Sequence, residues 1–189
     1  KALSGRIDLT LPFNSTLAFI GRWNKTDTYL PVKFVCCGPL PVKPVIDVNQ
    51  QQQSETLTLT LEGRTRPVEW WESRGRISYF ENSQGFQDPV DPGFDFDFPS
   101  FAQINVQRRE AEWINAFHIG KWSTSTVGLE YRHEEGENKG VFSARTHTYS
   151  AFFEQQLRFF ERLFITGGVR VDDHSTFGTH VTPRGSVAF

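Results

Sequence analysis

The sequence closes with the stretch Arg162-Leu-Phe-Ile-Thr-Gly-Gly-Val-Arg-Val-Asp-Asp-His-Ser-Thr-Phe-Gly-Thr-His-Val-Thr-Pro-Arg-Gly-Ser-Val-Ala-Phe189. In its first part, from 163 to 172, apolar and polar residues alternate. Leu163, Ile165 and Val171 fall in one set, and Arg170 falls in the other. A period of two places every second side chain on the same face of a strand. A polar segment at 173–180 and a second alternating segment at 181–189 follow. The stretch therefore predicts two antiparallel strands joined by a loop.

The same alternation recurs along the rest of the chain, most regularly where Leu57, Leu59 and Leu61 alternate with threonines. The predicted strands are nine: Ser4–Leu11, Thr16–Trp23, Ser54–Glu62, Trp70–Phe80, Phe101–His118, Thr126–Arg132, Thr148–Leu157, Leu163–Asp172 and Val181–Phe189. One segment, 152–164, would also suit a helix, and we interpret it as strand, turn and strand. The fold class that follows is all-β and antiparallel.

The predicted connections alternate between short and long. The short links lie at Pro12–Asn14, Gly63–Pro67, Ile119–Ser123 and Arg158–Arg162, and the long polar links lie at Asn24–Gln53, Glu81–Ser100, His133–Ala144 and Asp173–His180. The four-glutamine run 50–53 is interpreted as a solvated loop tip. Outer-membrane β-barrels have short turns at the periplasmic end and long loops at the extracellular end. The alternation thus favours a transmembrane β-barrel and gives its orientation.

The two faces of such strands have different solvents. The apolar face suits lipid, whereas charged side chains need water or partners. We expect seven charges to line a lumen: Arg6, Asp8, Arg74, Arg76, Glu110, Glu130 and Arg170. Trp70, Trp71 and Trp122 lie near short turns, and Trp23 lies near a long link. We interpret these tryptophans as the aromatic girdles of a membrane barrel, with ordinary core tryptophan as the alternative.

Composition narrows the classes of protein that the chain could be. Aromatic residues make up 14 % of the 189 residues, there is no methionine, and the mean hydropathy is −0.43. No apolar run reaches the roughly 18 residues that a membrane helix needs. The net charge of −2 and the lack of a dense Lys/Arg cluster argue against a nucleic-acid partner. A barrel stays possible, because its strands are only half apolar.

The sequence motifs that would indicate catalysis, a metal site or a cofactor site are incomplete or absent. His133-Glu134-Glu135 lacks the second histidine of a zinc-protease helix, because position 137 is glutamate. The trio at 172–174, Asp-Asp-His, is interpreted as solvated loop charge rather than a cation site. The adjacent Cys36 and Cys37 are interpreted as loop thiols or a rare vicinal disulfide. No phosphate loop, dinucleotide fingerprint or nucleophile elbow is present. We therefore expect neither catalysis nor a cofactor.

The closing stretch resembles a hairpin of TonB-dependent outer-membrane receptors. That family often carries a strand of the form Leu-Thr-x-Gly-x-Arg-x-Asp, a loop with Phe-Gly and a return strand that opens with Pro-Arg. The matching positions are Gly168, Arg170, Asp172, Phe177, Gly178, Pro183 and Arg184. Two upstream segments, 126–132 and 108–115, resemble the preceding strands, so the motif match covers roughly the last 90 residues. Among the subfamilies, the vitamin B12 (cobalamin) receptors look nearest, and siderophore receptors are also possible.

The resemblance implies a bacterial outer-membrane barrel of about 22 strands that holds an N-terminal plug domain and is driven by the TonB complex. The nine predicted strands would be part of that barrel, with residues 1–189 as one partial domain that lacks the plug. Alone, they should form an open, strongly curved sheet. Partners would be outer-membrane lipid, TonB through the plug, and cobalamin or an iron chelate as nutrient. Tyr29, Phe94, Phe96 and His174 are candidate ligand contacts in extracellular loops.

The ends of the sequence bear on this interpretation. Lys1 is neither an initiator methionine nor part of a signal peptide, so we expect the chain to be cut from a longer one. Nine is an odd number of strands, whereas single-chain bacterial barrels have even counts. Phe189 resembles the aromatic end of an outer-membrane protein, but the resemblance places it on an internal strand.

Two other classes of protein remain open at this point. One is a secreted β-sandwich that binds carbohydrate through exposed aromatics such as Trp70, Trp71, Phe94, Phe96 and Phe98. It does not explain why the long links all fall at one end. The other is a porin or a barrel enzyme, which shares the architecture and has no plug. The sequence alone favours the receptor.

Overall fold

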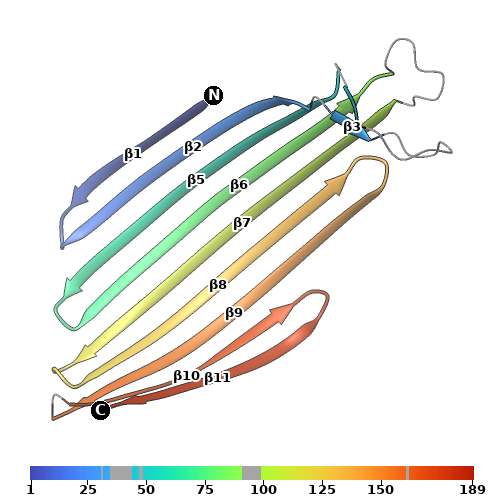
Figure 1. The fold of residues 1–189 in the computed structure, drawn as a ribbon. Helices are drawn as coiled ribbons and strands as arrows, with labels where there is room; N and C mark the ends of the chain where they lie inside the picture. Colours follow the sequence, from blue (N-terminus) through green and yellow to red (C-terminus); the bar gives the residue numbers. More distant parts are fainter. Residues whose placement is uncertain (31, 35–43, 47–48, 91–98, 161) are drawn as a thin grey trace.

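The computed structural model describes residues 1–30, 32–34, 44–46, 49–90, 99–160 and 162–189. Nine of its strands form one antiparallel sheet, in which each strand pairs with its neighbours along the chain (Figure 1). They are β1 (Ala2–Leu11), β2 (Ser15–Tyr29), β5 (Gln51–Val68), β6 (Trp71–Asp88), β7 (Ser100–Ile119), β8 (Ser123–Asn138), β9 (Phe142–Phe159), β10 (Leu163–His174) and β11 (Gly178–Ala188). The short strands β3 (Val32–Phe34) and β4 (Pro44–Ile46) pair only with each other.

All nine predicted strands are present, and the ambiguous segment 152–164 is strand, turn and strand. The strands are longer than predicted, mainly at the end of the sheet that carries the β2–β5 and β6–β7 connections, here called the loop end. The predicted long links at 133–144 and 173–180 are wrong, because strands occupy most of them and leave three-residue turns at 139–141 and 175–177. Backbone pairing with neighbouring strands continues there after the apolar alternation has stopped.

Two further predictions about connections are corrected. Three of the four glutamines, 51–53, belong to β5 and pair with both β2 and β6, so the run is not a loop tip. The turn predicted at Gly63–Pro67 lies later, at Glu69 and Trp70, because β5 continues through a bulge between Thr65 and Val68. A bulge adds a residue without ending the strand. The opposite end of the sheet, with these tight turns, is here called the turn end.

The register divides the side chains of the sheet into two sets. In all eight strand pairings the numbers of paired residues add up to an even number, apart from the bulge of β5. Neighbours in register share a face and successive residues alternate. Even-numbered residues therefore share one face of the whole sheet, the even face, and odd-numbered residues share the other, the odd face.

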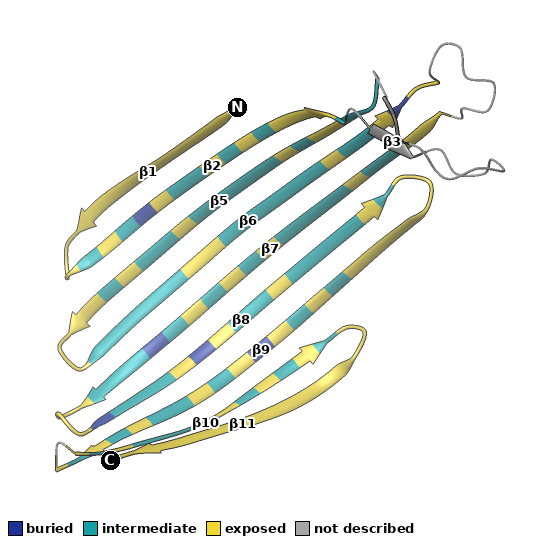
Figure 2. Cartoon of the chain, in the orientation of Figure 1, coloured by how far each residue is buried: buried dark blue, intermediate teal, exposed yellow. Residues whose placement is uncertain are grey.

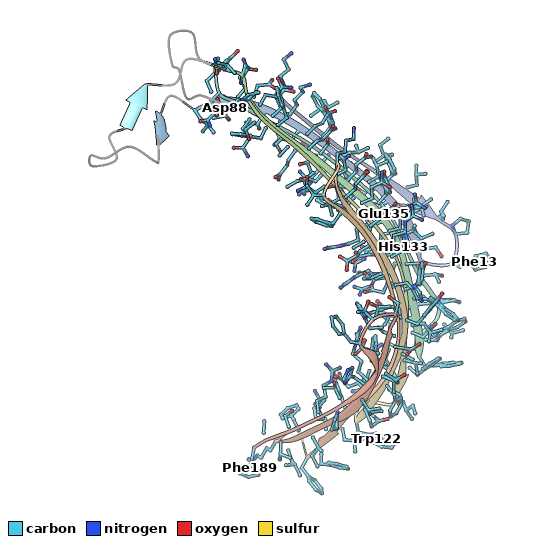
Figure 3. All side chains as sticks on the ribbon, turned by 90° about the vertical axis from the view of Figure 1, so that its right-hand side faces the viewer. Phe13, Asp88, Trp122, His133, Glu135 and Phe189 are labelled. Carbon is cyan, nitrogen blue, oxygen red and sulfur yellow. The ribbon has the colours of Figure 1, made fainter. Side chains whose placement is uncertain are left out.

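The sheet is a single curved layer. Seen along its width it bends into an arc (Figure 3), and the charged even face lies on the concave side. Among the described residues Ala18 is the one buried hydrophobic side chain. The edge strands β1 and β11 are exposed along their whole length (Figure 2). This is the open, curved, partial barrel expected from the sequence, and the β-sandwich alternative is wrong because the nine strands form one continuous sheet.

The odd face carries a continuous apolar belt. Many of its side chains are largely exposed, among them Ile77 at 62 % and Leu129 at 50 %. The belt consists of Ile7, Leu9, Leu17, Phe19, Leu57, Leu59, Leu61, Ile77, Ala111, Trp113, Val127, Leu129, Ala151, Phe153, Val169, Val171 and Val181. An exposed apolar surface of this extent needs an apolar environment or a partner. No helix among the described residues is long and apolar enough to cross a membrane.

The loop-end boundary of the belt descends in steps from β2 to β10. The first ionisable odd-face residue beyond it is Lys25 on β2, Glu55 on β5, Glu81 on β6, Arg109 on β7, His133 on β8, His147 on β9 and Asp173 on β10. Lys25 and Glu55 are close enough for an ion pair, whereas by register Glu81 stands one odd-face position lower and Arg109 one lower again. A boundary that descends across successive strands is expected when tilted strands cross a flat apolar layer.

The height of the belt matches a bilayer. On β6 Trp71 stands at the turn-end boundary and Glu81 at the loop-end boundary, ten residues away. Ten residues span roughly 33 Å along a strand. At a tilt of about 45° this is roughly 23 Å along the barrel axis, close to the apolar band of about 25 Å in outer-membrane barrels.

Aromatic side chains mark both boundaries of the belt, as predicted for the tryptophans. At the turn end Trp70 stacks on Phe117 with 6.3 Å between ring centroids, and Trp71 Nε1 donates to Asn115 Oδ1 at 3.0 Å. At the loop end the rings of Tyr131 and Tyr149 lie 5.0 Å apart. Trp23, also at the loop-end boundary, donates its indole N–H to Glu55 Oε1 at 2.8 Å. Rings with one polar atom suit such an interface.

Candidate functional site

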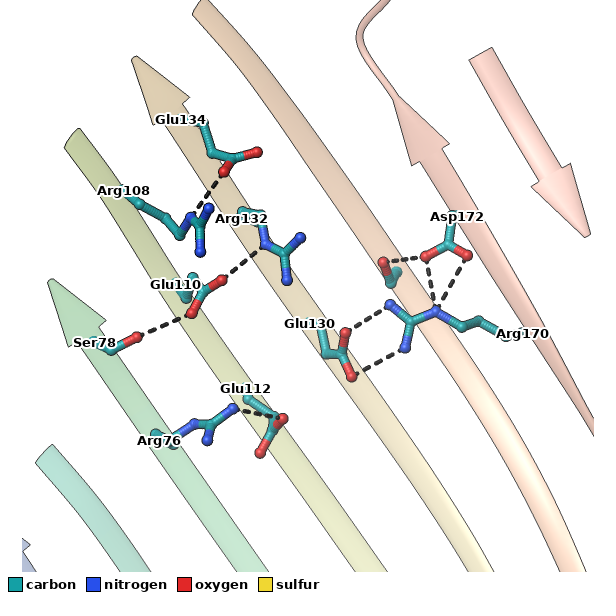
Figure 4. A network of polar contacts seen from close by, with 11 residues as sticks. Arg76, Ser78, Arg108, Glu110, Glu112, Glu130, Arg132, Glu134, Arg170 and Asp172 are labelled. Carbon is teal, nitrogen blue, oxygen red and sulfur yellow. Dashed lines mark hydrogen bonds and ion pairs between the residues drawn. The ribbon is translucent and has the colours of Figure 1, made fainter. Parts of the chain in front are cut away.

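The even face of the central strands is a lattice of opposite charges (Figure 4). All seven charges that we expected to line a lumen lie on this face, which confirms the assignment of the two faces. Glu112 on β7 accepts from Arg74 Nη2 at 3.1 Å and from Arg76 Nη2 at 3.2 Å, both on β6. One carboxylate thus joins two arginines two residues apart on the neighbouring strand.

A second group of contacts crosses β6, β7 and β8. Glu110 accepts from Ser78 Oγ at 3.2 Å and from Arg132 Nε at 2.8 Å. Two residues from Glu110 along β7, toward the loop end, Arg108 Nε donates to Glu134 Oε1 at 2.8 Å. Each carboxylate is therefore paired with an arginine of a neighbouring strand, which is how charges are tolerated on a half-buried sheet face.

The third group is centred on Arg170 of β10. Its Nη1 and Nη2 donate to the two carboxylate oxygens of Glu130 at 3.1 and 2.6 Å, and its Nε donates to Asp172 Oδ1 at 2.9 Å. Ser150 Oγ donates to Asp172 at 2.5 Å. Since Glu130 lies on β8, the guanidinium spans across β9, and its carbon lies 6.0 Å from the ring centroid of Phe152. A planar, bidentate cation suits this crossing better than lysine would.

These groups enclose a polar depression of about 250 Å³ on the concave face, lined by Arg76, Glu110, Glu112, Glu130, Arg132, Thr148, Ser150 and Arg170. Its walls present both signs of charge. A polar solute or a polar protein segment can exchange hydrogen bonds with such a wall, whereas apolar groups gain nothing there.

Sequence reasoning missed part of this lattice, namely Arg108, Glu112, Arg132 and Glu134, and it also missed Glu154, which pairs with Arg184. The signal was present, because Arg108, Glu110 and Glu112 recur at every second position, and so do Glu130, Arg132 and Glu134. Their pairing depends on the register between strands, which alternation within one strand does not give.

The family-motif residues around β10 and β11 have structural roles. A Cβ at Gly168 would stand 2.9 Å from the backbone oxygen of Phe153 and 3.2 Å from Arg184 Nε, so glycine makes room for the arginine. Arg184 in turn pairs with Glu154 on β9. Gly178 has a φ of +74°, and the preceding Phe177 contacts the ring of His174. Pro183 sits opposite Val169, on the outer edge strand of the sheet.

The trio at 172–174 is not solvated loop charge, as predicted, but part of β10. Asp172 lies on the even face in the Arg170 group, and Asp173 on the odd face accepts from Thr179 Oγ1 at 2.7 Å. The two carboxylates point to opposite faces and each has a hydroxyl or guanidinium partner.

The candidate ligand contacts are dispersed. Tyr29 ends β2 and is 67 % exposed, and His174 ends β10, where its Nδ1 accepts from the backbone N–H of Thr176 at 3.1 Å. Both lie at the loop end, but β5, β6, β7, β8 and β9 separate their strands. Phe94 and Phe96, like Cys36 and Cys37, lie outside the described residues. The ligand-binding role of these residues stays a prediction.

Three solved structures of similar fold are receptors for siderophores or for ferric enterobactin. The siderophore receptor PirA from Pseudomonas aeruginosa is 14 % identical, with a TM-score of 0.72 over 98 % of this chain and 29 % of that one. A mutant of the ferric enterobactin receptor PfeA from the same organism is 15 % identical, with a TM-score of 0.72 over 98 % and 30 %. PirA from Acinetobacter baumannii is 16 % identical, with a TM-score of 0.66 over 98 % and 30 %. The chain thus spans less than a third of these proteins.

The family comparison agrees with the geometry. Among curated proteins, none matches this sequence. The family model described as TonB dependent receptor-like, beta-barrel matches residues 13–189, which is nearly the whole chain and reaches well upstream of the hairpin that first suggested the family. The chain therefore belongs to the TonB-dependent receptor-like β-barrel family.

Proposed function

We propose that the chain is part of the wall of an outer-membrane transporter that imports a scarce nutrient. The observation that supports this most is the two-faced arc: an apolar belt of bilayer height on the convex face and paired charges on the concave face. In a closed barrel the first would face lipid and the second a polar lumen. The family is one of bacterial outer-membrane transport receptors and not of enzymes.

The nine strands would be completed by strands of the same longer protein. Both edge strands expose backbone groups that lipid cannot satisfy, so closure by further strands is required in a membrane. A barrel of about 22 strands would leave room for a plug domain, and the lattice of charges on the even face would face that plug. Energy would come from the TonB complex through the plug.

For the nutrient we favour a ferric siderophore over cobalamin. The names of the three similar solved structures refer to siderophores or ferric enterobactin, which supports the iron chelate. Their identities of 14–16 % are evidence for a shared fold only. Recognition would use the loop end, where exposed Tyr29 and half-buried His174 are candidates. Phe94 and Phe96 complete the set of proposed contacts.

The test uses a strain that lacks the whole gene containing this chain. Uptake of ⁵⁵Fe-loaded siderophores and of ⁵⁷Co-cobalamin is measured with and without the gene, each in cells with and without TonB. Loss of uptake of one iron chelate, both on deletion of the gene and on deletion of TonB, is the expected result. Loss of cobalamin uptake instead would overturn the choice of nutrient, and uptake that persists without TonB would indicate a plugless, porin-type barrel.

A further inference from the structure

The odd face carries a row of basic side chains immediately beyond the apolar belt. Arg109 on β7 pairs in register with His133 on β8, which pairs in register with His147 on β9. One odd-face position nearer the turn end, Tyr131 and Tyr149 mark the boundary of the belt. Three adjacent strands thus place a guanidinium and two imidazoles side by side, one odd-face position beyond the two tyrosines.

Arg109 differs in its partners from Arg145, a nearby arginine on the same face. Within the described part of the chain it makes no hydrogen bond or ion pair, whereas Arg145, on the same face one odd position further out, is held by Glu135 at 2.7 Å. The rings of His147 and Tyr149 lie 5.7 Å apart between centroids in an edge-on arrangement, and among the described residues neither His133 nor His147 has a side-chain hydrogen bond. A cation and two N–H donors are therefore available together.

The acidic groups nearby are already engaged. Glu81 accepts from the hydroxyl of Tyr79 at 2.7 Å, Glu135 is paired with Arg145, and Asp173 accepts from Thr179. The row consequently presents a guanidinium and two imidazoles whose neighbouring carboxylates already accept hydrogen bonds from other groups. An anion that lies at the boundary of the belt and carries apolar chains on one side would complement both surfaces.

We propose that Arg109, His133 and His147 bind the phosphate of an anionic lipid headgroup at the loop-end surface of the membrane. The inference rests on the proposed function, because it places the belt in a bilayer. The acyl chains would lie on Leu129, Ala151 and the neighbouring belt, and the tyrosines would lie at the glycerol level. Arg109 contributes the charge, and each histidine donates one hydrogen bond when neutral.

The experiment uses the complete receptor in nonionic detergent, with native mass spectrometry of bound phosphatidylglycerol and of zwitterionic phosphatidylcholine as probes. The wild-type protein should retain phosphatidylglycerol preferentially. The combined variant R109Q/H133Q/H147Q should lose about fivefold in that preference, the effect of about one cationic side chain at a membrane surface. The matched control R145Q removes a paired cation from the same face and should change nothing.

Three outcomes would overturn the site: an unchanged preference in the triple variant, an equal loss in R145Q, or displacement of the lipid by inorganic phosphate, which would indicate a site for the free anion. Heat-modifiable migration on gels verifies that each variant is folded. Uptake is measured on the same variants. If the wild-type receptor imports its nutrient but shows no lipid preference, only the lipid site is contradicted. If it shows no uptake at all, the proposed function is contradicted.

Discussion

The ring of Phe152 on β9 lies over Gly128 on β8, in the space that a side chain at position 128 would occupy. The guanidinium carbon of Arg170 lies 6.0 Å from the centroid of the same ring. Glycine, ring and cation therefore form one packed unit beside the charged side chains of the even face. This unit allows Arg170 to reach Glu130 across β9.

The first prediction concerns this unit. Gly128→Ala should destabilise the complete receptor by about 1–3 kcal/mol, because the new methyl group must displace the ring. Gly136→Ala, on the same strand and face, is the control, since nothing lies within 4 Å of its Cβ position. Urea unfolding of the refolded receptor in detergent measures both. Equal midpoints for the two variants would contradict the packing, and adding Phe152→Ala should recover part of the loss.

Adjacent glycines on β10 give the second prediction. A Cβ at Gly168 meets the backbone oxygen of Phe153 at 2.9 Å, whereas a Cβ at Gly167 meets nothing within 4 Å. Backbone cannot yield as a flexible side chain can, so Gly168→Ala should destabilise the barrel and release Arg184 from Glu154. Gly167→Ala should be neutral or slightly stabilising, because alanine restricts the unfolded chain. The same urea titration distinguishes them, and the idea fails if Gly167→Ala costs as much as Gly168→Ala.

The third prediction compares two arginines of the even face. Arg170→Met removes the four hydrogen bonds of the guanidinium and leaves Glu130 and Asp172 without their cation. Because the arginine side chain is still 38 % exposed, we expect a loss of roughly 1 kcal/mol, at the low end for charged hydrogen bonds. Arg6→Met is the control. Its partner Asp8 lies on the same strand, both side chains are more than half exposed, and the unfolding midpoint should hardly change.

Much of this fold could be predicted from local alternation, because the solvent on each face selects every second residue. The triplet Leu57, Leu59 and Leu61 is apolar since lipid-facing positions must be, and the threonines between them are not. The extensions of the strands could not be predicted in this way. Gln51–Gln53 has polar side chains on both faces, and it is a strand only because β2 and β6 supply backbone partners.

The charge lattice shows the same division between local and long-range information. That Glu130 and Arg170 face the lumen follows from their own strands. That they bind each other depends on the intervening β9, on the register set by the tight turn at 139–141 between β8 and β9, and on the register between β9 and β10. The residue types along one strand therefore predict the face on which a charged side chain lies. Its ion-pair partner is known only when the pairing of the whole sheet is known.

The last prediction tests the two environments on one strand. Leu59 belongs to the apolar belt and Thr60 to the even face, so successive positions of β5 should contact lipid and lumen. Leu59→Arg should destabilise the folded barrel by about 2–4 kcal/mol, the cost of an arginine near the middle of the bilayer, whereas Thr60→Arg should cost far less.

Spin labels at the two positions, on a background with Cys36 and Cys37 changed to serine, give an independent measurement. The label at 59 should be relaxed by oxygen and that at 60 by a water-soluble nickel chelate. The reverse pattern would contradict the assignment of the faces.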